Sequence, residues 1–180
     1  MRFVLINNGE TSQDKLKRML VKHGSYIVMP ADDMNPSIIH PDDVIILNSG
    51  PGNVYEKNRF TNQVKLLRTH PGKIIGICLG MQLISKTFGS SVVKRERRLN
   101  NRRIAIYPFG DNSVIVEPVK VWENRYWAVH TVPKGFEVLA NSNSDIEIIK
   151  HKSKPIWGML FHPEYSGKIG EHIFNEILKQ

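Results

Sequence analysis

The stretch GKIIGICLGMQL, Gly72 to Leu83, contains the chain's single cysteine, set between two glycines at the end of an apolar run. KIIGI has the pattern of a buried strand, and LGMQL begins the helix that follows it. A strand that passes directly into a helix at a candidate nucleophile has the geometry of a nucleophile elbow. Gly76 lies two residues before Cys78 and Gly80 two residues after it. Neither has a Cβ atom, which would collide with the chain in so sharp a turn. The stretch therefore predicts an α/β fold with Cys78 at the carboxyl end of a central strand, where open α/β sheets bind ligands.

The rest of the first half also alternates short apolar strands with helix-like segments, which predicts a mainly parallel central sheet flanked by helices. We expect strands at 2–6, 25–29 and 43–49, and helices at 11–24, 59–70 and 79–89. The segment 43–49 is rich in β-branched residues and is therefore expected to be central.

From about Ser90 the sequence changes to short β-like segments separated by turn residues. These segments lie at 90–94, 103–107, 113–117, 120–124, 127–132, 136–140, 146–150 and 155–161. Some of them should form an antiparallel addition to the main sheet, and 166–180 reads as a closing amphipathic helix. Because no repeat or linker interrupts the chain, we expect a single domain over 1–180.

Composition narrows the class of protein. The chain has 180 residues and 41% hydrophobic residues, enough for one buried core. One cysteine and no Cys/His ligand spacing lead us to expect neither a structural metal site nor a cofactor. The N-terminal apolar run is too short for a signal peptide, and no run approaches a membrane span. We expect a soluble cytoplasmic protein that is not membrane-bound.

The formal net charge of +8 is concentrated in KRERRLNNRR, residues 94–103. We interpret this segment chiefly as a solvated loop and secondly as a surface for a protein partner. It has no aromatic residue on which bases could stack, so we do not expect nucleic-acid binding. The candidate contact residues are Lys94, Arg95, Arg97, Arg98, Arg102 and Arg103.

A thiol nucleophile needs a base, and the base needs an orienting acceptor. His162 ends an apolar strand in MLFHPEYS, and Pro163 stops that strand from continuing in regular pairing. Glu164 follows two residues later, where an extended backbone returns its side chain to the same side as His162. The carboxylate can accept from one imidazole nitrogen and leave the other for Cys78.

An oxyanion site is the third requirement. LNSGPGN, residues 47–53, follows a strand that should neighbour the elbow strand. Gly50 and Gly52 can expose backbone amides that no side chain covers, and the amide of Leu79 follows the nucleophile directly. Alone, SGPG is more often an ordinary turn, so its value lies in being a second glycine-rich loop at a strand end.

The three motifs GICLGMQL, NSGPG and FHPE occur in an order that resembles the class I glutamine amidotransferase family with a Cys-His-Glu triad. The resemblance implies that Cys78 attacks the side-chain amide of L-glutamine and forms a γ-glutamyl thioester. It implies that His162 protonates the departing ammonia and activates water, and that Glu164 orients His162. By position in the motifs, Gly50, Gly52 and Leu79 would stabilise the oxyanion, and Gln82 would help to hold glutamine.

The chain has no synthetase half or P-loop motif, so the resemblance also implies a separate ammonia-accepting synthetase subunit. The segments 119–142 and 155–164 are most similar to the separate amidotransferase subunit of GMP synthetase. NSGPG is instead more similar to the motif of the anthranilate and aminodeoxychorismate synthase components and of carbamoyl phosphate synthetase. Met81, Arg125 and Trp127 depart from the GMP synthetase pattern. A paralogue that serves another synthetase therefore remains an alternative.

Two other classes remain alternatives. The first is a stand-alone hydrolase of γ-glutamyl bonds, which would share the nucleophile, base and elbow. The second is a non-catalytic regulatory or RNA-binding module, which the basic segment 94–103 suggests.

Overall fold

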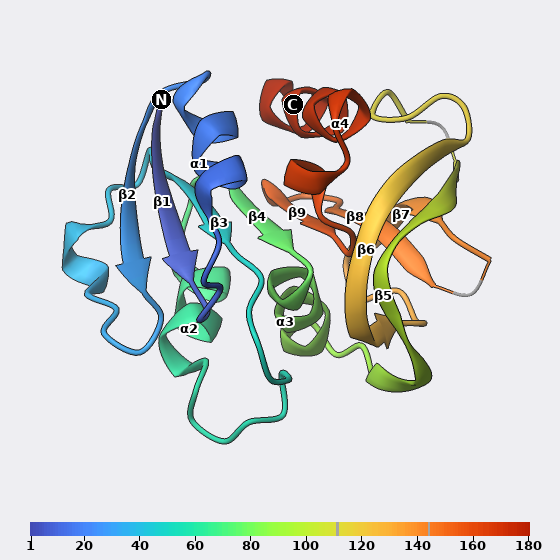
Figure 1. Ribbon diagram of the computed structural model, residues 1–180. Helices are drawn as coiled ribbons and strands as arrows, with labels where there is room; N and C mark the ends of the chain where they lie inside the picture. The colour runs from blue at the N-terminus through green and yellow to red at the C-terminus, as the bar shows by residue number, and fades with distance from the viewer. Residues whose placement is uncertain (111, 144) are drawn as a thin grey trace.

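The computed structural model describes residues 1–110, 112–143 and 145–180, and its described strands form one sheet (Figure 1). The strand order is β2-β1-β3-β4-β9-β8-β7-β5-β6. The parallel part consists of β1 (Arg2–Asn7), β2 (Ser25–Pro30), β3 (Val44–Leu47), β4 (Ile74–Ile77) and β9 (Ile156–Met159). The antiparallel part consists of β8 (Ile146–His151), β7 (Phe136–Asn141), β5 (Val92–Pro108) and β6 (Val119–Val129).

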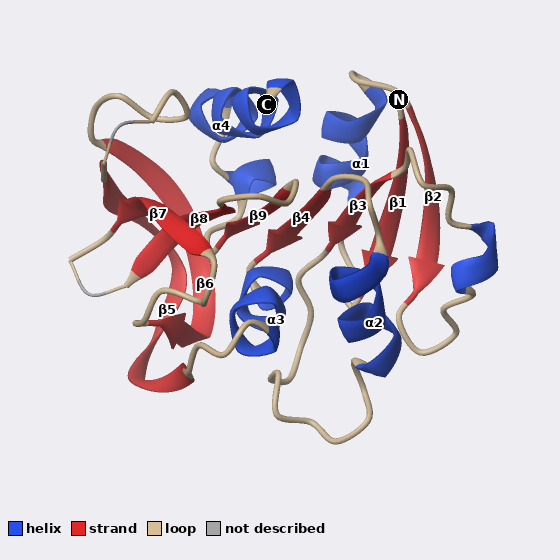
Figure 2. Ribbon diagram, turned by 180° about the vertical axis from the view of Figure 1, so that it is seen from behind, coloured by secondary structure: helices blue, strands red, loops and turns tan. Residues whose placement is uncertain are grey.

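Helices cover both faces of the parallel strands, as Figure 2 shows from behind. One face carries α1 (Asp14–Val21) and α4 (Lys168–Lys179), and the other carries α2 (Thr61–Thr69) and α3 (Leu79–Thr87). Short 3-10 helices lie at η1 (Pro36–Ile38) and η2 (Pro163–Tyr165). Alternate residues of each parallel strand enter one of two apolar cores, because side chains alternate across a strand.

The structure confirms the expected mixed fold. The four early strands and the three early helices lie within or close to their expected ranges. The predicted central strand, β3, pairs on one side with β1 and on the other with β4, which leads into the elbow. This pairing brings the ends of β3 and β4 together, and with them the two glycine-rich loops.

The solvated-loop interpretation of residues 94–103 is wrong. These residues belong to β5, which joins the expected strands 90–94 and 103–107 into one strand of 17 residues. They pair with β6, which likewise joins 120–124 to the first half of 127–132. Two register shifts interrupt the β5–β6 pairing within this basic stretch, and such irregularities increase the local twist of a strand pair. Many charged side chains of this twisted ribbon are exposed.

The expected strand at 113–117 is not formed. The Asn112 side-chain oxygen accepts hydrogen bonds from the backbone amides of Val114 and Ile115 at 3.2 and 3.1 Å. This local turn supplies the bonds that a strand ladder would otherwise provide. Val114 and Ile115 are nevertheless buried, so the apolar pattern reflects core packing and not a strand.

Among the described helices, none combines the length and apolar character needed to span a membrane.

Candidate active site

Cys78 occupies the turn between β4 and α3 with a backbone φ of 51° and ψ of −104°, a conformation that non-glycine residues rarely adopt. A Cβ atom on Gly80 would lie 2.0 Å from the carbonyl oxygen of Leu47 in β3. A Cβ atom on Gly76 would lie 2.6 Å from the backbone carbon of Gly80. Both glycines are therefore required sterically, and the predicted elbow is present.

His162 follows β9 and begins the turn into η2. Its Nδ1 lies 2.9 Å from Glu164 Oε1, and both side chains are only 6% exposed. The imidazole therefore directs Nδ1 toward the carboxylate, as the spacing in FHPE predicts. His162 Nε2 is buried and has no hydrogen-bond partner among the described residues. That nitrogen is free to exchange a proton with a reacting group.

The charge state of His162 depends on its neighbours. Burial lowers the pKa of the imidazole, but the charges of Glu164 and Cys78, together with the hydrogen bond to Glu164, raise it by more. The pKa of His162 therefore lies well above its usual value. A base with a raised pKa is suited to hold the proton that a cysteine nucleophile gives up.

The antiparallel part of the sheet holds His162 in place, which sequence reasoning did not find. The His162 backbone amide donates to the carbonyl of Trp122 in β6 at 3.0 Å. Ser166 Oγ donates to the carbonyl of His162 at 2.7 Å and accepts from the Trp122 amide at 2.9 Å. The Trp122 ring meets the imidazole edge-on at 5.3 Å and stacks on Tyr165 at 4.7 Å. No local sequence signal identifies these contacts, because Trp122 and His162 are distant in the chain.

The other predicted site residues surround two cavities that meet at Cys78. A cavity of about 300 Å³ is lined by Gly50, Gly52, Cys78, Leu79 and Gln82, together with residues of β5 and β6. The second, of about 350 Å³, is lined by Cys78, Gly50 and His162 among others. A larger cavity of about 400 Å³ beside α2 and α3 is lined by none of the predicted site residues.

Two features of the first cavity fit amide binding. Gln82 lies on the first turn of α3, is 2% exposed, and its Oε1 has no donor among the described residues. An unpartnered buried acceptor in a cavity wall is suited to a ligand N–H group. Gly50 cannot carry a side chain, because a Cβ atom there would lie 2.1 Å from the carbonyl oxygen of Asn8.

The glycine-rich loop after β3 is clamped by Arg59, another residue that sequence reasoning missed. The Arg59 guanidinium donates to the carbonyls of Pro51 and Asn8, each at 2.8 Å, and to Glu56 at 2.8 Å. Glu56 in turn accepts from the Asn53 amide at 2.7 Å. The loop that presents Gly50 and Gly52 is therefore tied to the end of β1 and to the residues before α2.

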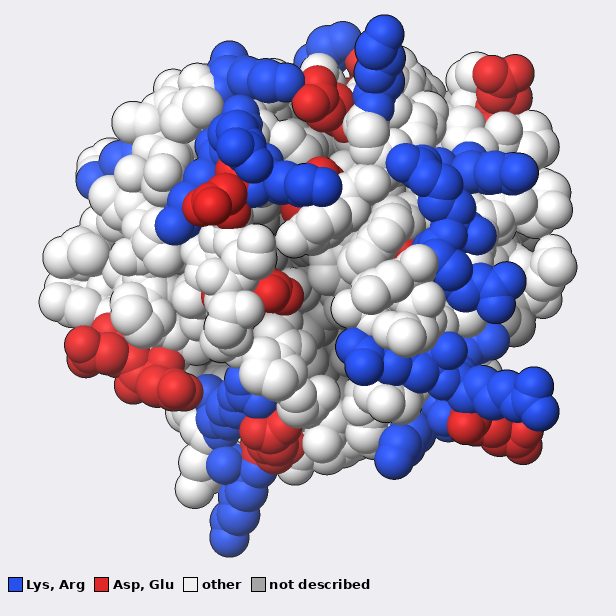
Figure 3. All heavy atoms as spheres, in the orientation of Figure 1, with Lys and Arg blue, Asp and Glu red and all other residues white. Residues whose placement is uncertain are grey.

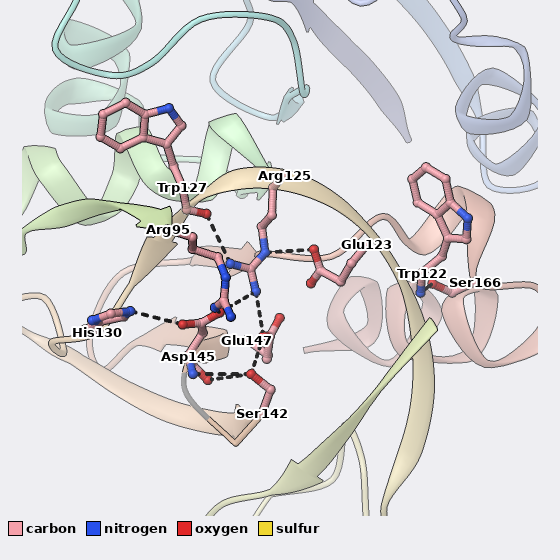
Figure 4. A network of polar contacts seen from close by, with 10 residues as sticks. All are labelled: Arg95, Trp122, Glu123, Arg125, Trp127, His130, Ser142, Asp145, Glu147 and Ser166. Atoms are coloured by element: carbon pink, nitrogen blue, oxygen red, sulfur yellow. Dashed lines mark hydrogen bonds and ion pairs between the residues drawn. The ribbon is translucent and has the colours of Figure 1, made fainter. Parts of the chain in front are cut away.

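Arg125 is buried, and its guanidinium is fully engaged beneath the first cavity (Figure 4). It donates to Glu123 at 2.7 Å, to the Trp127 carbonyl at 3.1 Å, and to both Asp145 and Glu147 at 2.9 Å. Burial lowers the pKa of Arg125, but the surrounding carboxylates raise it by more, so the group stays charged. Arg125 thus ties the cavity-lining part of β6 to β8 and the turn before it.

Glu123 has an unusual ionisation within the same network. Burial raises the pKa of Glu123, and the charge of Glu147 raises it further, so that it lies well above its usual value despite Arg125. The network contains the three carboxylates Glu123, Asp145 and Glu147 and the two guanidinium groups of Arg95 and Arg125. With a proton on Glu123, the formal charges of these five groups balance.

Met81, one of the residues that depart from the GMP synthetase pattern, lies on α3 and is fully buried. A Cβ atom on Gly158 of β9 would lie 2.8 Å from its Cγ atom, so the side chain packs directly on that glycine. Met81 therefore secures α3 against the sheet.

Within the described parts of the chain, no cluster of histidine, cysteine and acidic side chains has the arrangement of a metal site.

Comparison with known proteins agrees with this geometry. The model of the family "Glutamine amidotransferase class-I" matches residues 4–180. A subunit of the glutamine-hydrolyzing GMP synthase of Methanococcus maripaludis strain C5 is 33% identical, over 98% of this chain and 95% of the relative. The protein of the same name from Methanocaldococcus jannaschii is also 33% identical, over 98% and 93%.

A solved structure shows the same fold. It is a Thermoplasma acidophilum protein proposed to be a GMP synthase subunit, and it superposes with a TM-score of 0.88 at 25% identity. The match covers 99% of this chain and 92% of that one. The chain belongs to the class-I glutamine amidotransferase family.

Proposed function

We propose that this chain acts, as one domain over 1–180, as the glutamine-hydrolysing subunit of a two-subunit, cytoplasmic GMP synthetase. The observation that carries the proposal is the meeting at Cys78 of a strained elbow, a glycine-rich loop and the His162–Glu164 pair. The similar proteins named as subunits of GMP synthase support the choice of synthetase. The chain covers nearly the whole length of those relatives.

In the first half of the reaction, His162 Nε2 takes the proton of the Cys78 thiol, and the sulfur attacks the γ-carboxamide carbon of L-glutamine. The carbonyl oxygen becomes an oxyanion, which backbone amides of the loop with Gly50 and Gly52 and the amide of Leu79 stabilise. His162 then donates a proton to the amide nitrogen. The C–N bond breaks, ammonia leaves, and a γ-glutamyl thioester remains on Cys78.

In the second half, His162 Nε2 accepts a proton from water, and the resulting hydroxide attacks the thioester carbon. The C–S bond breaks, glutamate leaves, and the Cys78 thiolate and protonated His162 are restored. Glu164 keeps Nδ1 as a donor throughout, so that only Nε2 exchanges protons with substrate. Gln82 Oε1, which lacks a donor among the described residues, accepts from an N–H group of the bound glutamine.

The partner surface is proposed on the β5–β6 ribbon, close to the cavities. Figure 3 shows Lys and Arg side chains gathered on the side of the molecule where this ribbon lies. Lys94, Arg97 and Arg102 are exposed there, whereas Arg95 is partly buried and paired with Asp145. Such a basic surface suits an acidic surface of the synthetase subunit.

Ammonia release from L-glutamine by the purified chain, alone and with the GMP-forming synthetase subunit, tests the function. We expect glutamate and ammonia in equal amounts, and transfer of ¹⁵N from the glutamine side chain into GMP in the mixture. Replacing Lys94, Arg97 and Arg102 with Glu should lower nitrogen transfer by weakening association. A folded chain with no ammonia release in either condition would contradict the proposal, and release without transfer would exclude this synthetase.

A further inference from the structure

Arg98 is an exposed residue of β5 that lines both cavities meeting at Cys78. Its guanidinium carbon lies 4.8 Å from the centre of the Tyr126 ring in β6, which holds the cation by a cation–π contact. Among the described residues, no carboxylate forms an ion pair with Arg98. The side chain therefore offers an unneutralised, oriented guanidinium at the mouth of the site.

Arg98 is the charged residue of the first cavity that can still bind a ligand. Arg98 and Arg125 are the charged residues among those that line this cavity. The Arg125 side chain is 1% exposed, and each of its three nitrogen atoms is already bonded within the protein. A negatively charged ligand group entering this cavity thus meets Arg98.

L-Glutamine carries such a group at a fixed distance from its reacting amide. Four carbon–carbon bonds separate the γ-carboxamide carbon from the α-carboxylate carbon, about 5 Å in an extended chain. Since Cys78 and Arg98 line the same cavity of about 300 Å³, a glutamine with its amide at Cys78 directs its carboxylate toward the mouth. A guanidinium matches a carboxylate with two parallel hydrogen bonds.

The same mouth has a group suited to the α-ammonium of glutamine. Asn124 lines both cavities with Arg98, and its buried Oδ1 has no donor among the described residues. The mouth thus combines a cationic donor with a free acceptor, the pairing that an amino-acid head group needs. We propose that Arg98 is the residue that reads the α-carboxylate of glutamine, an inference that rests on the proposed function.

The test compares L-glutamine with 4-aminobutanamide, an amide that lacks the α-carboxylate. In Arg98→Ala, we expect kcat/KM for L-glutamine to fall by about tenfold to hundredfold, mainly through KM. For 4-aminobutanamide, kcat/KM should change less than about twofold, because no group is left for Arg98 to bind. Arg98→Lys should lie between wild type and Arg98→Ala. Arg68→Ala, on the exposed side of α2, controls for the loss of one positive charge.

A second readout is independent of the chemistry. In Cys78→Ala protein, calorimetric affinity for L-glutamine should fall by a similar factor when Arg98 is also replaced. Equal losses for both amides, no loss for glutamine, or an unchanged affinity would each overturn the assignment of Arg98. Arg98-dependent glutamine binding without ammonia release would instead keep the assignment and contradict the proposed function.

Discussion

The ionisation of His162 depends on Glu164 and Cys78, whose charges raise its pKa. Its folded-state pKa is raised above the unfolded value of about 6.5. The folded state therefore binds this proton more tightly than the unfolded state. The resulting stabilisation is fully present below about pH 6.5 and is lost as the pH rises through the folded pKa.

Replacing Glu164 with Gln should weaken this pH dependence, because the substitution removes one of the charges that raise the His162 pKa. The measurement is the free energy of unfolding in urea between about pH 6 and pH 9 for wild type and Glu164→Gln. We expect a smaller loss of stability with pH in the variant. The pKa of Glu123 is also raised, but Glu123 is present in both proteins. Its contribution to the pH dependence of stability therefore cancels in the comparison. Parallel pH profiles would contradict the account of His162.

Glu123 and Arg125 make a second test at the level of single residues. Because Glu123 favours its protonated form, Glu123→Gln should change the free energy of unfolding by less than about 1 kcal/mol. Arg125→Ala removes a cation that bonds all three buried carboxyl groups, of which Asp145 keeps Arg95, and should cost about 3 to 5 kcal/mol. Urea unfolding measures both values. Similar losses in the two variants would refute a protonated Glu123.

The turn at Cys78 and the contact between His162 and Glu164 could be predicted from sequence, because each lies in a short motif. GICLG specifies a turn, and the two-residue spacing from His162 to Glu164 specifies a shared side of the backbone. Arg125 could not be placed in this way, since a charged residue in a strand gives no sign of burial. Its environment is formed by Asp145 and Glu147, which approach through pairing between distant segments.

At the level of elements, the β4–α3 elbow depends on close contact with β3. Gly80→Ala should destabilise the protein by about 3 kcal/mol, because its Cβ would lie 2.0 Å from the backbone oxygen of Leu47. Ser85→Ala on the same helix is the control, since the buried Ser85 hydroxyl has no hydrogen-bond partner among the described residues. Urea unfolding should separate the two variants, and equal stability would contradict the steric account.

The loop after β3 gives a second prediction at this scale. Arg59→Ala removes the clamp on the loop without touching Cys78 and should lower kcat for ammonia release by about tenfold to hundredfold. Lys57→Ala, exposed on the same segment, should keep wild-type kcat. Steady-state kinetics with L-glutamine measures the difference. An unchanged kcat in Arg59→Ala would show that the loop holds its shape without the clamp.

Sequence patterns predicted the elements of the parallel half better than those of the antiparallel half. Strands β1 to β4 alternate with helices, and each has a continuous apolar run with clear ends. Strand β5 carries exposed charges through its middle, so its continuity depends on pairing with β6 and not on its own pattern. Residues 113–117 fail in the opposite way, because buried apolar side chains occupy a turn.

At the level of the whole molecule, the parallel sheet positions the nucleophile and the antiparallel ribbon completes its surroundings. β4 leads into Cys78, β9 leads into His162, and β3 leads into the glycine-rich loop. β6 then contributes the backbone contact to His162, while β5 contributes Arg98. The basic ribbon therefore joins the site to the surface on which we propose that the synthetase subunit binds.

The most direct test of the central claim is detection of the covalent intermediate. Carbon-labelled L-glutamine is added to the purified protein in the presence of its synthetase partner, and the mixture is quenched in acid and digested for peptide mapping by mass spectrometry. The account predicts a γ-glutamyl group in thioester linkage to Cys78 and no label in Cys78→Ala. Glutamine turnover with no adduct at Cys78, or turnover that persists in Cys78→Ala, would contradict it.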